Sequence, residues 1–304
     1  MSILWGIDLG GTKVEGVVLE EGYPPRTLAR LRVPTEKEKG YRHIVGQIGL
    51  LVEALKKETG LRPEKVGIGT PGALDPSSQT MKNSNTTVLN GQFFKRDIEE
   101  HLDLPIAMAN DANCFAVAEA MFGAVRSHAP EARVVFGVIM GTGVGGGVVV
   151  DGRVLGGRHG IAGEWGHNFL DISGGPCYCG LEGCVETIFS GPALERFYHG
   201  LTGQKRSLRE IATRAEKGGD DAAEQTLQRL VHFFGKGIAC IVNILDPDVV
   251  VLGGGVGNIE RLYRDGPAEC ERYVFNHSLQ TMFLKPELGD SAGVFGAALL
   301  VKDL

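Results

Sequence analysis

The chain has 304 residues, enough for about two domains of ordinary size. Glycine supplies 45 of them, about twice the average share. The absence of a G-X-Y repeat excludes a collagen-like chain, and 43% hydrophobic with 22% charged residues excludes a disordered one. A net charge of -6 argues against nucleic acid as a partner. The excess of glycine therefore needs a local explanation.

The amino-terminal segment has no basic stretch followed by a long apolar run, so we predict no secretory signal. The uncharged stretch 134–150 is too short and too rich in glycine for a membrane span. These features predict a cytoplasmic protein. The remaining cysteines outside one dense cluster lie in apolar helical surroundings and are expected to be core thiols; they are Cys114, Cys240 and Cys270.

In chain order, residues 3–9 and 13–22 predict two strands joined by a glycine turn. Apolar residues every three or four positions predict a helix over 41–59 that covers this hairpin and stops at Gly60. Residues 65–72 predict a buried strand that enters a turn. Residues 105–123 predict a strand that ends at Asn110-Asp111 and opens a helix.

The opening pattern returns at residues 134–154 as strand, glycine turn and strand, which indicates an internal duplication. The glycines of this second turn also fit G-x-G-x-x-G, the dinucleotide fingerprint of dehydrogenases. That fingerprint must open a helix, whereas these glycines lead into another strand, which disfavours it. A long helix over 222–245, a buried strand from 248 and a closing helix over 291–304 complete two α/β domains.

Three glycine turns can bring backbone N–H groups close to phosphate or nucleoside. In DLGGT (8–12) the N–H groups are free to face phosphate oxygens, and Asp8 at the strand end can hold Mg²⁺. The alternative is an ordinary hairpin turn with a solvated aspartate. MGTGVGGG (140–147) is the second turn. LGGGVGN (252–258) is the third, and by itself it is a common strand-to-helix connection.

Three cysteines fall within eight residues, at Cys177, Cys179 and Cys184, and His167 lies ten residues upstream. A Cys₃His set has the ligand count and chemistry of a closed tetrahedral zinc site, so we predict bound zinc there rather than a disulfide framework. The alternative is a group of idle thiols beside an unrelated histidine.

ANDAN (109–113) lies where a strand gives way to a helix, a position from which side chains line binding sites. Asp111 there can accept the proton of a substrate hydroxyl that attacks a phosphoryl group. The alternative is that Asp111 only caps the helix. With Asn110 and Asp111, Glu164 could grip sugar hydroxyls, although Glu164 and Glu186 alone would be ordinary loop charges.

Together, DLGGTK, PGALDP, ANDANC, GTGVGGG, GEWGH, CYCGLEGCVE and LGGG resemble, in order and spacing, the ROK (repressor, open reading frame, kinase) family over essentially the whole chain. The resemblance implies an α/β, actin-like ATPase fold of two duplicated ribonuclease-H-like domains with ATP and sugar in the cleft between them. We expect a small domain of residues 1–115 plus 290–304 and a large domain of 116–289. A homodimer is also implied.

The resemblance assigns the phosphates of ATP to two turns, formed by Gly10, Gly11, Thr12 and Lys13 and by Gly141, Thr142 and Gly143. It places Gly254 and Gly255 near the nucleoside, Asp8 at Mg²⁺ and Asp111 as catalytic base. The sugar pocket would be lined by Asn85, Asn110, Asp111, Glu164, His167 and Glu186. His167 would share its two ring nitrogens between structural zinc and a sugar hydroxyl.

Residues 82–94, KNSNTTVLNGQFF, resemble the fructokinase subgroup, which implies phosphorylation of fructose at the 6-hydroxyl. The alternatives are a glucokinase or an N-acetylhexosamine kinase. Sugar-responsive repressors of the same family carry a helix-turn-helix domain before the first strand, which here begins at residue 3, so that reading is disfavoured. A nucleotide-dependent filament or switch protein would not predict the zinc loop.

Overall fold

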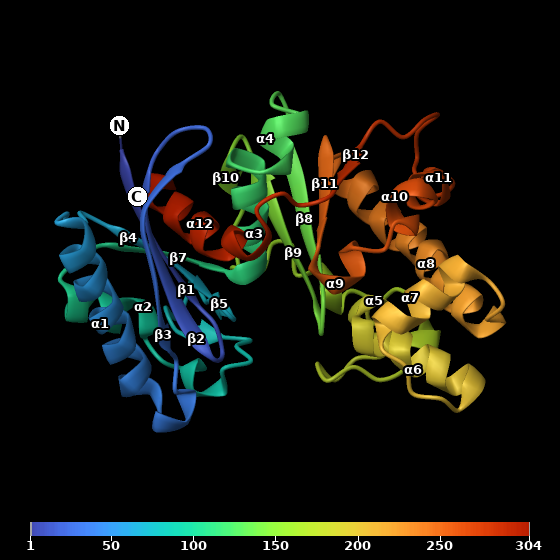
Figure 1. Cartoon of the computed structure of the whole chain (residues 1–304), viewed down its shortest axis with the longest axis horizontal. Coiled ribbons are helices and arrows are strands. Elements are labelled where there is room, and N and C mark those ends of the chain that lie inside the picture. The colour runs from blue at the N-terminus through green and yellow to red at the C-terminus, as the bar shows by residue number, and fades with distance from the viewer. Residues whose placement is uncertain (1, 304) are drawn as a thin grey trace. The chain divides into compact units, whose positions relative to one another are not determined.

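The computed structural model describes residues 2–303 and contains two five-stranded sheets of matching design (Figure 1). The first runs in the order β3-β2-β1-β4-β7, with β1 (Ile3–Leu9), β2 (Lys13–Glu20), β3 (Arg26–Pro34), β4 (Val66–Thr70) and β7 (Ile106–Asn110). The second runs β10-β9-β8-β11-β12, with β8 (Val134–Met140), β9 (Val144–Val150), β10 (Arg153–Val154), β11 (Val249–Gly253) and β12 (Met282–Leu284). The repeated order confirms the predicted duplication.

Both predicted hairpins are present, and the glycines at 141–146 join two strands, as the argument against a dinucleotide fingerprint requires. β3 was not predicted, although arginines alternate with apolar residues along it in the period of an edge strand with one solvated face. The short pair β5 (Ala73–Leu74) and β6 (Met81–Lys82) was also missed. The closing helix is shorter than predicted: α12 (Ala292–Leu299) gives way to a 3₁₀ turn over Leu300–Asp303, and residue 304 lies outside the described part.

By the density of its internal contacts the chain forms two compact units. Unit 1 comprises residues 1–130, 147–162 and 287–304, and unit 2 comprises 131–146 and 163–286. The predicted domains, 1–115 plus 290–304 and 116–289, stay a prediction, because contact-rich units are not shown to fold independently.

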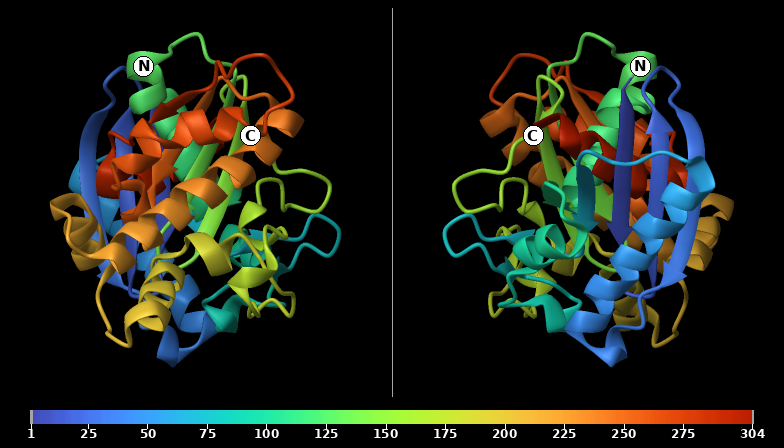
Figure 2. Two further views of the ribbon diagram at one scale, coloured as in Figure 1. Left: turned by 90° about the vertical axis from the view of Figure 1, so that its right-hand side faces the viewer. Right: turned by 90° about the vertical axis from the view of Figure 1, so that its left-hand side faces the viewer.

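Helices cover both faces of the first sheet, as Figures 1 and 2 show for α1 (Tyr41–Thr59) beside β2 and β3. Successive residues of a strand face opposite sides, so Trp5, Ile7 and Leu9 of β1 join the core beneath α1. The residues between them, Gly6 and Asp8, face α12. As predicted, α1 ends at Gly60, which caps it in the left-handed conformation.

The closing helix approaches the sheet and α3 (Asp111–Met121) at backbone distance. A Cβ atom on Gly67 of β4 would lie 1.8 Å from the carbonyl oxygen of Ala297, and one on Gly296 would lie 1.8 Å from that of Cys114. Real Cβ atoms do not approach other atoms so closely, so only glycine fits. These contacts account for glycines that lie outside the three glycine turns.

We expect Gly296→Ala to lower the unfolding midpoint measured by thermal scanning, because overpacking a tight contact costs about 1–3 kcal/mol. The matched control is Gly46→Ala in α1, where a Cβ would meet nothing within 4 Å. Alanine favours a helix interior over glycine, so the control should unfold at the same or a higher temperature. A Gly296→Ala protein as stable as the Gly46→Ala protein would contradict the close approach.

The core of unit 2 is built on aromatic side chains. Trp165 packs between Phe136 and Phe189, with ring centroids 5.9 and 5.5 Å away, and Phe189 contacts Phe234 of α8 (Asp221–Leu245) at 6.4 Å. This anchors the segment that carries Glu164 and His167. The remaining helices are α2 (Phe94–Leu102), α4 (Ala124–His128), α5 (Glu186–Phe189), α6 (Gly191–Thr202), α7 (Leu208–Lys217), α9 (Gly254–Gly257), α10 (Arg261–Arg264) and α11 (Gly266–Glu271).

Candidate active site

Two carboxylates meet at one edge of the first sheet. Asp8 lies near the end of β1, where a Cβ on Gly293 of α12 would be 2.9 Å from its Oδ2 atom. Asp111 follows β7 directly and opens α3. Burial first, then the charge of Asp111 and that of Glu15, raises the pKa of Asp8 to about 6. Burial also raises the pKa of Asp111. Burial therefore disfavours the charged form of both carboxylates.

The helix cap at this edge is Asn110 and not Asp111. The Asn110 Oδ1 atom accepts the backbone N–H of Asn113 at 2.8 Å, whereas Asp111 Oδ1 accepts the N–H of the adjacent Ala112, also at 2.8 Å. The reading of Asp111 as a mere cap is therefore wrong, because the position before the first helical residue belongs to Asn110. Asp111 stays a candidate base, and a role of Asn110 toward sugar stays a prediction.

The first glycine turn is closed by a hydrogen bond from the N–H of Gly10 to the carbonyl of Lys13, at 2.9 Å. The ammonium of Lys13 reaches back to Glu15 at 3.1 Å. Burial alone would raise the pKa of Glu15, but hydrogen bonds from Arg32, Arg30 and Lys13 lower it below its usual range. Lys13 therefore belongs to a cluster of charges around Glu15. To contact phosphate, its ammonium group must either bind phosphate and Glu15 at once or give up its bond to Glu15.

Asn85 is exposed on a loop whose neighbours Ser84 and Thr86 are buried. The side chain of Asn90 fixes this loop: its Oδ1 accepts the Ser84 N–H at 2.9 Å, and its Nδ2 donates to the Ser84 carbonyl at 3.0 Å. Asn90 is the asparagine of the Leu-Asn-Gly segment. Sequence reasoning identified that segment but did not identify the residue that holds the loop.

The second glycine turn is tied to a predicted sugar-binding residue. Gly141 donates to the carbonyl of Gly143 at 2.9 Å, and the carboxylate of Glu186 accepts the next N–H, that of Val144, at 2.8 Å. A Cβ on Gly143 would lie 2.6 Å from Glu186 Oε2. Glu186 begins α5, so its side chain joins the turn to the segment after the cysteine cluster.

The third turn packs against the strand that leads into the second one. Gly254 has φ +79°, and a Cβ there would lie 2.4 Å from the carbonyl oxygen of Met140. Gly255 is exposed, and a Cβ there would meet nothing within 4 Å. The positive φ and the nearby Met140 carbonyl thus leave no room for a side chain at residue 254, whereas a side chain at residue 255 would meet only open space. The assignment of both to the nucleoside stays a prediction.

His167, Cys177, Cys179 and Cys184 form one cluster, with their candidate ligand atoms all within 4.8 Å of one another. His167 Nδ1 lies 3.6 Å from Cys177 Sγ, and the Sγ atoms of Cys179 and Cys184 are 3.7 Å apart. One imidazole and three sulfurs at this spacing fit a tetrahedral zinc ion. Of the other cysteines, Cys114 and Cys270 are buried as predicted, but Cys240 is exposed, because it lies on the outer face of α8.

Tyr178, which sequence reasoning missed, lies against the other nitrogen of His167. Its hydroxyl oxygen is 3.0 Å from His167 Nε2, and the two rings meet edge to face with centroids 5.2 Å apart. The residue is 82% exposed. Desolvation and then the charge of Glu186, with a further contribution from Glu164, raise the pKa of Tyr178. Glu164 and Glu186 therefore act electrostatically on the Tyr178 hydroxyl, which itself contacts His167 within unit 2.

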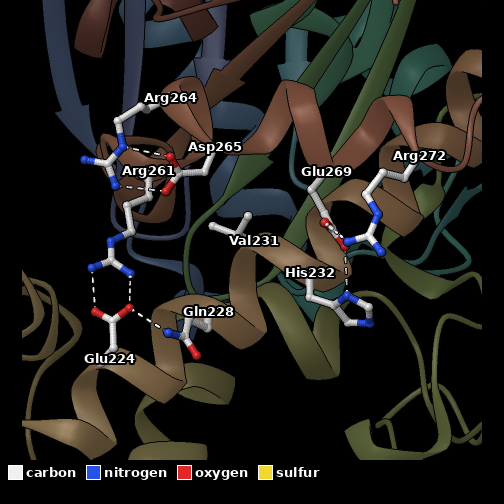
Figure 3. A pocket seen from close by; sticks show the side chains of 9 residues that line it. All are labelled: Glu224, Gln228, Val231, His232, Arg261, Arg264, Asp265, Glu269 and Arg272. Carbon is white, nitrogen blue, oxygen red and sulfur yellow. Dashed lines mark hydrogen bonds and ion pairs between the residues drawn. The ribbon is translucent and has the colours of Figure 1, made fainter.

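A pocket of about 420 Å³ lies elsewhere in unit 2, between α8, α10 and α11 (Figure 3). Its cations are paired within the pocket. Arg261 makes two bonds to Glu224 at 2.8 and 2.5 Å, Arg264 binds Asp265, and Arg272 and His232 share Glu269. None of the predicted site residues lines it. This pocket is a salt-bridged joint between helices rather than the predicted site.

A profile of the ROK family matches residues 4–304 of the chain. The chain belongs to the ROK family. An N-acetyl-D-glucosamine kinase of Aliivibrio salmonicida is 34% identical over 97% of this chain and 98% of its own length. A ROK hexokinase from Thermus thermophilus is 35% identical, with a TM-score of 0.87 over 100% of both chains. A ROK family glucokinase from Streptomyces griseus, solved with glucose and AMPPNP, is 28% identical, with a TM-score of 0.76 over 100% of both chains.

Membership of the ROK family confirms the predicted mixed α/β architecture, which matches kinases of the actin-like ATPase fold. The family relatives named above are all sugar kinases. Among residues 2–303, no helix combines the length and the apolar character that crossing a membrane requires.

Proposed function

We propose that this ROK family chain transfers the γ-phosphoryl group of ATP to a hydroxyl of a hexose. The observation that carries the proposal is the pair formed by Asp111 and Asp8, two carboxylates with raised pKa values at the end of parallel strands. A buried carboxylate with a raised pKa is a stronger base than a solvated one. The kinase relatives support this reading.

In the proposed reaction the sugar hydroxyl attacks the γ-phosphorus, and Asp111 accepts the proton of that hydroxyl. As the sugar oxygen bonds to the phosphorus, the bond from the phosphorus to the bridging oxygen of ADP breaks. Carboxylate oxygens such as those of Asp8 are suitable ligands for Mg²⁺, and this ion would neutralise phosphate charge when bound. The N–H groups of Gly10 and Gly141 close their own turns. Phosphate would therefore be met by Gly11 and Thr12, and by Thr142 and Gly143.

In unit 2, Glu164, His167 and Glu186 would bind sugar hydroxyls, and in unit 1 Asn85 and Asn110 would do so. The metal cluster would act as a brace: four protein ligands leave no open position on zinc, so its contribution when bound is to hold His167 and the loop of residues 177–184 in place. The homodimer remains part of the proposal, resting on family resemblance alone.

Two acceptor sugars are proposed, each on a different observation. The relatives named N-acetyl-D-glucosamine kinase favour that sugar over fructose. Residues 82–94, with the loop held by Asn90, favour fructose through their resemblance to the fructokinase subgroup. The comparisons weigh more heavily toward N-acetyl-D-glucosamine, because they rest on the whole chain and not on one segment.

The deciding experiment measures ADP release with N-acetyl-D-glucosamine, fructose, glucose, mannose and N-acetylmannosamine under identical conditions. We expect one of the first two to give the highest kcat/KM, by about tenfold or more over the others, because unpaired buried polar groups disfavour the wrong sugar. The Asp111→Asn protein serves as the background control. No turnover above that background with any of these sugars would refute the proposed function.

A further inference from the structure

Tyr178 lies between two members of the metal cluster, Cys177 and Cys179, and turns back onto a third, His167. Backbone hydrogen bonds hold its segment: the N–H of Cys177 donates to the Leu181 carbonyl at 2.8 Å, and that of Gly180 donates to the Cys177 carbonyl at 3.0 Å. The phenol itself is 82% exposed. The Tyr178 side chain can therefore swing away from His167 by rotating about its own bonds, without any movement of the backbone.

The contact between Tyr178 and His167 uses the nitrogen that a ligand would need. His167 Nδ1 faces the cysteine sulfurs, and a ring nitrogen that serves a metal presents its lone pair, which leaves the ring proton on Nε2. That N–H points at the Tyr178 hydroxyl oxygen, 3.0 Å away. The donor proposed above to bind a sugar hydroxyl is thus already paired inside the protein.

We propose that Tyr178 is an internal competitor of the acceptor sugar, occupying the sugar-binding N–H of His167 until a sugar hydroxyl displaces it. The proposal rests on the proposed function, because it assigns the Nε2 donor to the sugar. A sugar hydroxyl must replace the phenol oxygen, so the hydrogen bond that the sugar makes to His167 is offset by the one that the protein loses. Tyr178 thereby weakens, by the same factor, the binding of every sugar that uses this donor, because the bond to be broken belongs to the free protein.

The test compares Tyr178→Phe with wild type by calorimetric titration of N-acetyl-D-glucosamine and of fructose in the absence of ATP, and by steady-state kinetics. Phenylalanine keeps the ring and removes only the hydroxyl. We expect the Kd and the KM for the sugar to fall by about two- to tenfold, the range of one neutral hydrogen bond, with kcat and the KM for ATP unchanged. The ratio of Kd values between two sugars that both bind this donor should stay the same, because both are freed of the same competitor.

Tyr23→Phe is the matched control, because Tyr23 is also exposed and its hydroxyl hydrogen-bonds to that of Ser127 in unit 1, whereas His167 belongs to unit 2. Metal analysis should find the same zinc content in both variants and in wild type. Unchanged or weaker sugar binding by Tyr178→Phe, with wild type binding sugar normally, would overturn the role of Tyr178 alone. If wild type binds and phosphorylates no sugar, the proposed function fails and this inference fails with it.

Discussion

Asp111→Asn should reduce kcat by about 10²–10⁴-fold, the range expected when a positioned general base is removed, while the affinity for ATP stays within a few fold. Asparagine keeps the shape of the side chain and an oxygen that can accept the Ala112 N–H, now 2.8 Å from the carboxylate. What it loses is the capacity to take a proton. The measurements are steady-state kinetics with the best acceptor and a direct titration of nucleotide.

The same variant should be more stable than wild type at neutral pH. Burial raises the pKa of Asp111, so folding favours its protonated form, and the stability that this proton supplies is lost as the pH rises through the folded pKa. Asparagine mimics the protonated state at every pH. We therefore expect a higher unfolding midpoint at pH 7–8 and no difference below about pH 4, where the carboxyl is protonated in both folded and unfolded chains.

Asp97→Asn is the matched control, since Asp97 is buried but in a favourable environment. The hydroxyl of Tyr41 donates to it at 2.7 Å and Arg96 at 2.9 Å, and these hydrogen bonds lower its pKa. A lowered pKa contributes stability above the unfolded pKa, so the control should lose about 1 kcal/mol at neutral pH and keep its activity. If Asp111→Asn retained wild-type kcat, Asp111 would not be the base, whatever its effect on stability.

Replacing one cluster cysteine should remove a stoichiometric metal. We expect wild type to carry about one zinc per chain and Cys184→Ser to carry none, because Cys184 is fully buried and its sulfur lies 3.7 Å from that of Cys179. Folding and metal binding are coupled at such sites. A loss of several kcal/mol corresponds to a fall of about 5–15 °C in the unfolding midpoint for a chain of this size.

The loss should extend to the sugar site. His167 is both a predicted metal ligand and a proposed sugar contact, and the segment after the cluster leads directly to Glu186. Sugar affinity should therefore fall in Cys184→Ser, whereas nucleotide affinity should fall less. Cys240→Ser, at an exposed cysteine outside the cluster, should keep both zinc and sugar binding. A Cys184→Ser protein with full zinc content would show that the cluster is not the metal site.

Much of the fold could be predicted, because its signals are local. Helix α1 was predicted from its apolar spacing and its glycine stop, and the two hairpins from glycine turns between apolar strands. The edge strand β3 was missed, although its arginines alternate with apolar residues as in a strand. Two of these arginines, Arg30 and Arg32, bind Glu15 on the neighbouring strand, a carboxylate buried between them and Lys13, and no local pattern shows this pairing.

The candidate site divides in the same way. The cysteines and His167 were predicted to cluster because they are near in sequence, and they do. The link between Glu186 and the second glycine turn, by contrast, joins residues that are 42 positions apart. Cys240 was wrongly placed in the core, since the apolar residues around it lie on the opposite side of its helix.

The sequence by itself therefore determined the glycine turns, the two hairpins and the clustering of His167 with three cysteines, since each depends on spacing within one short segment. Only the tertiary structure decided why Gly67 and Gly296 must lack a side chain, because the atoms that exclude one come from Ala297 and Cys114, far along the chain. The tertiary structure alone placed Asp8 beside Asp111. Burial of Asp8, together with the nearby charge of Asp111, raises the pKa of Asp8. Packing and desolvation act between distant segments, and no local pattern records them.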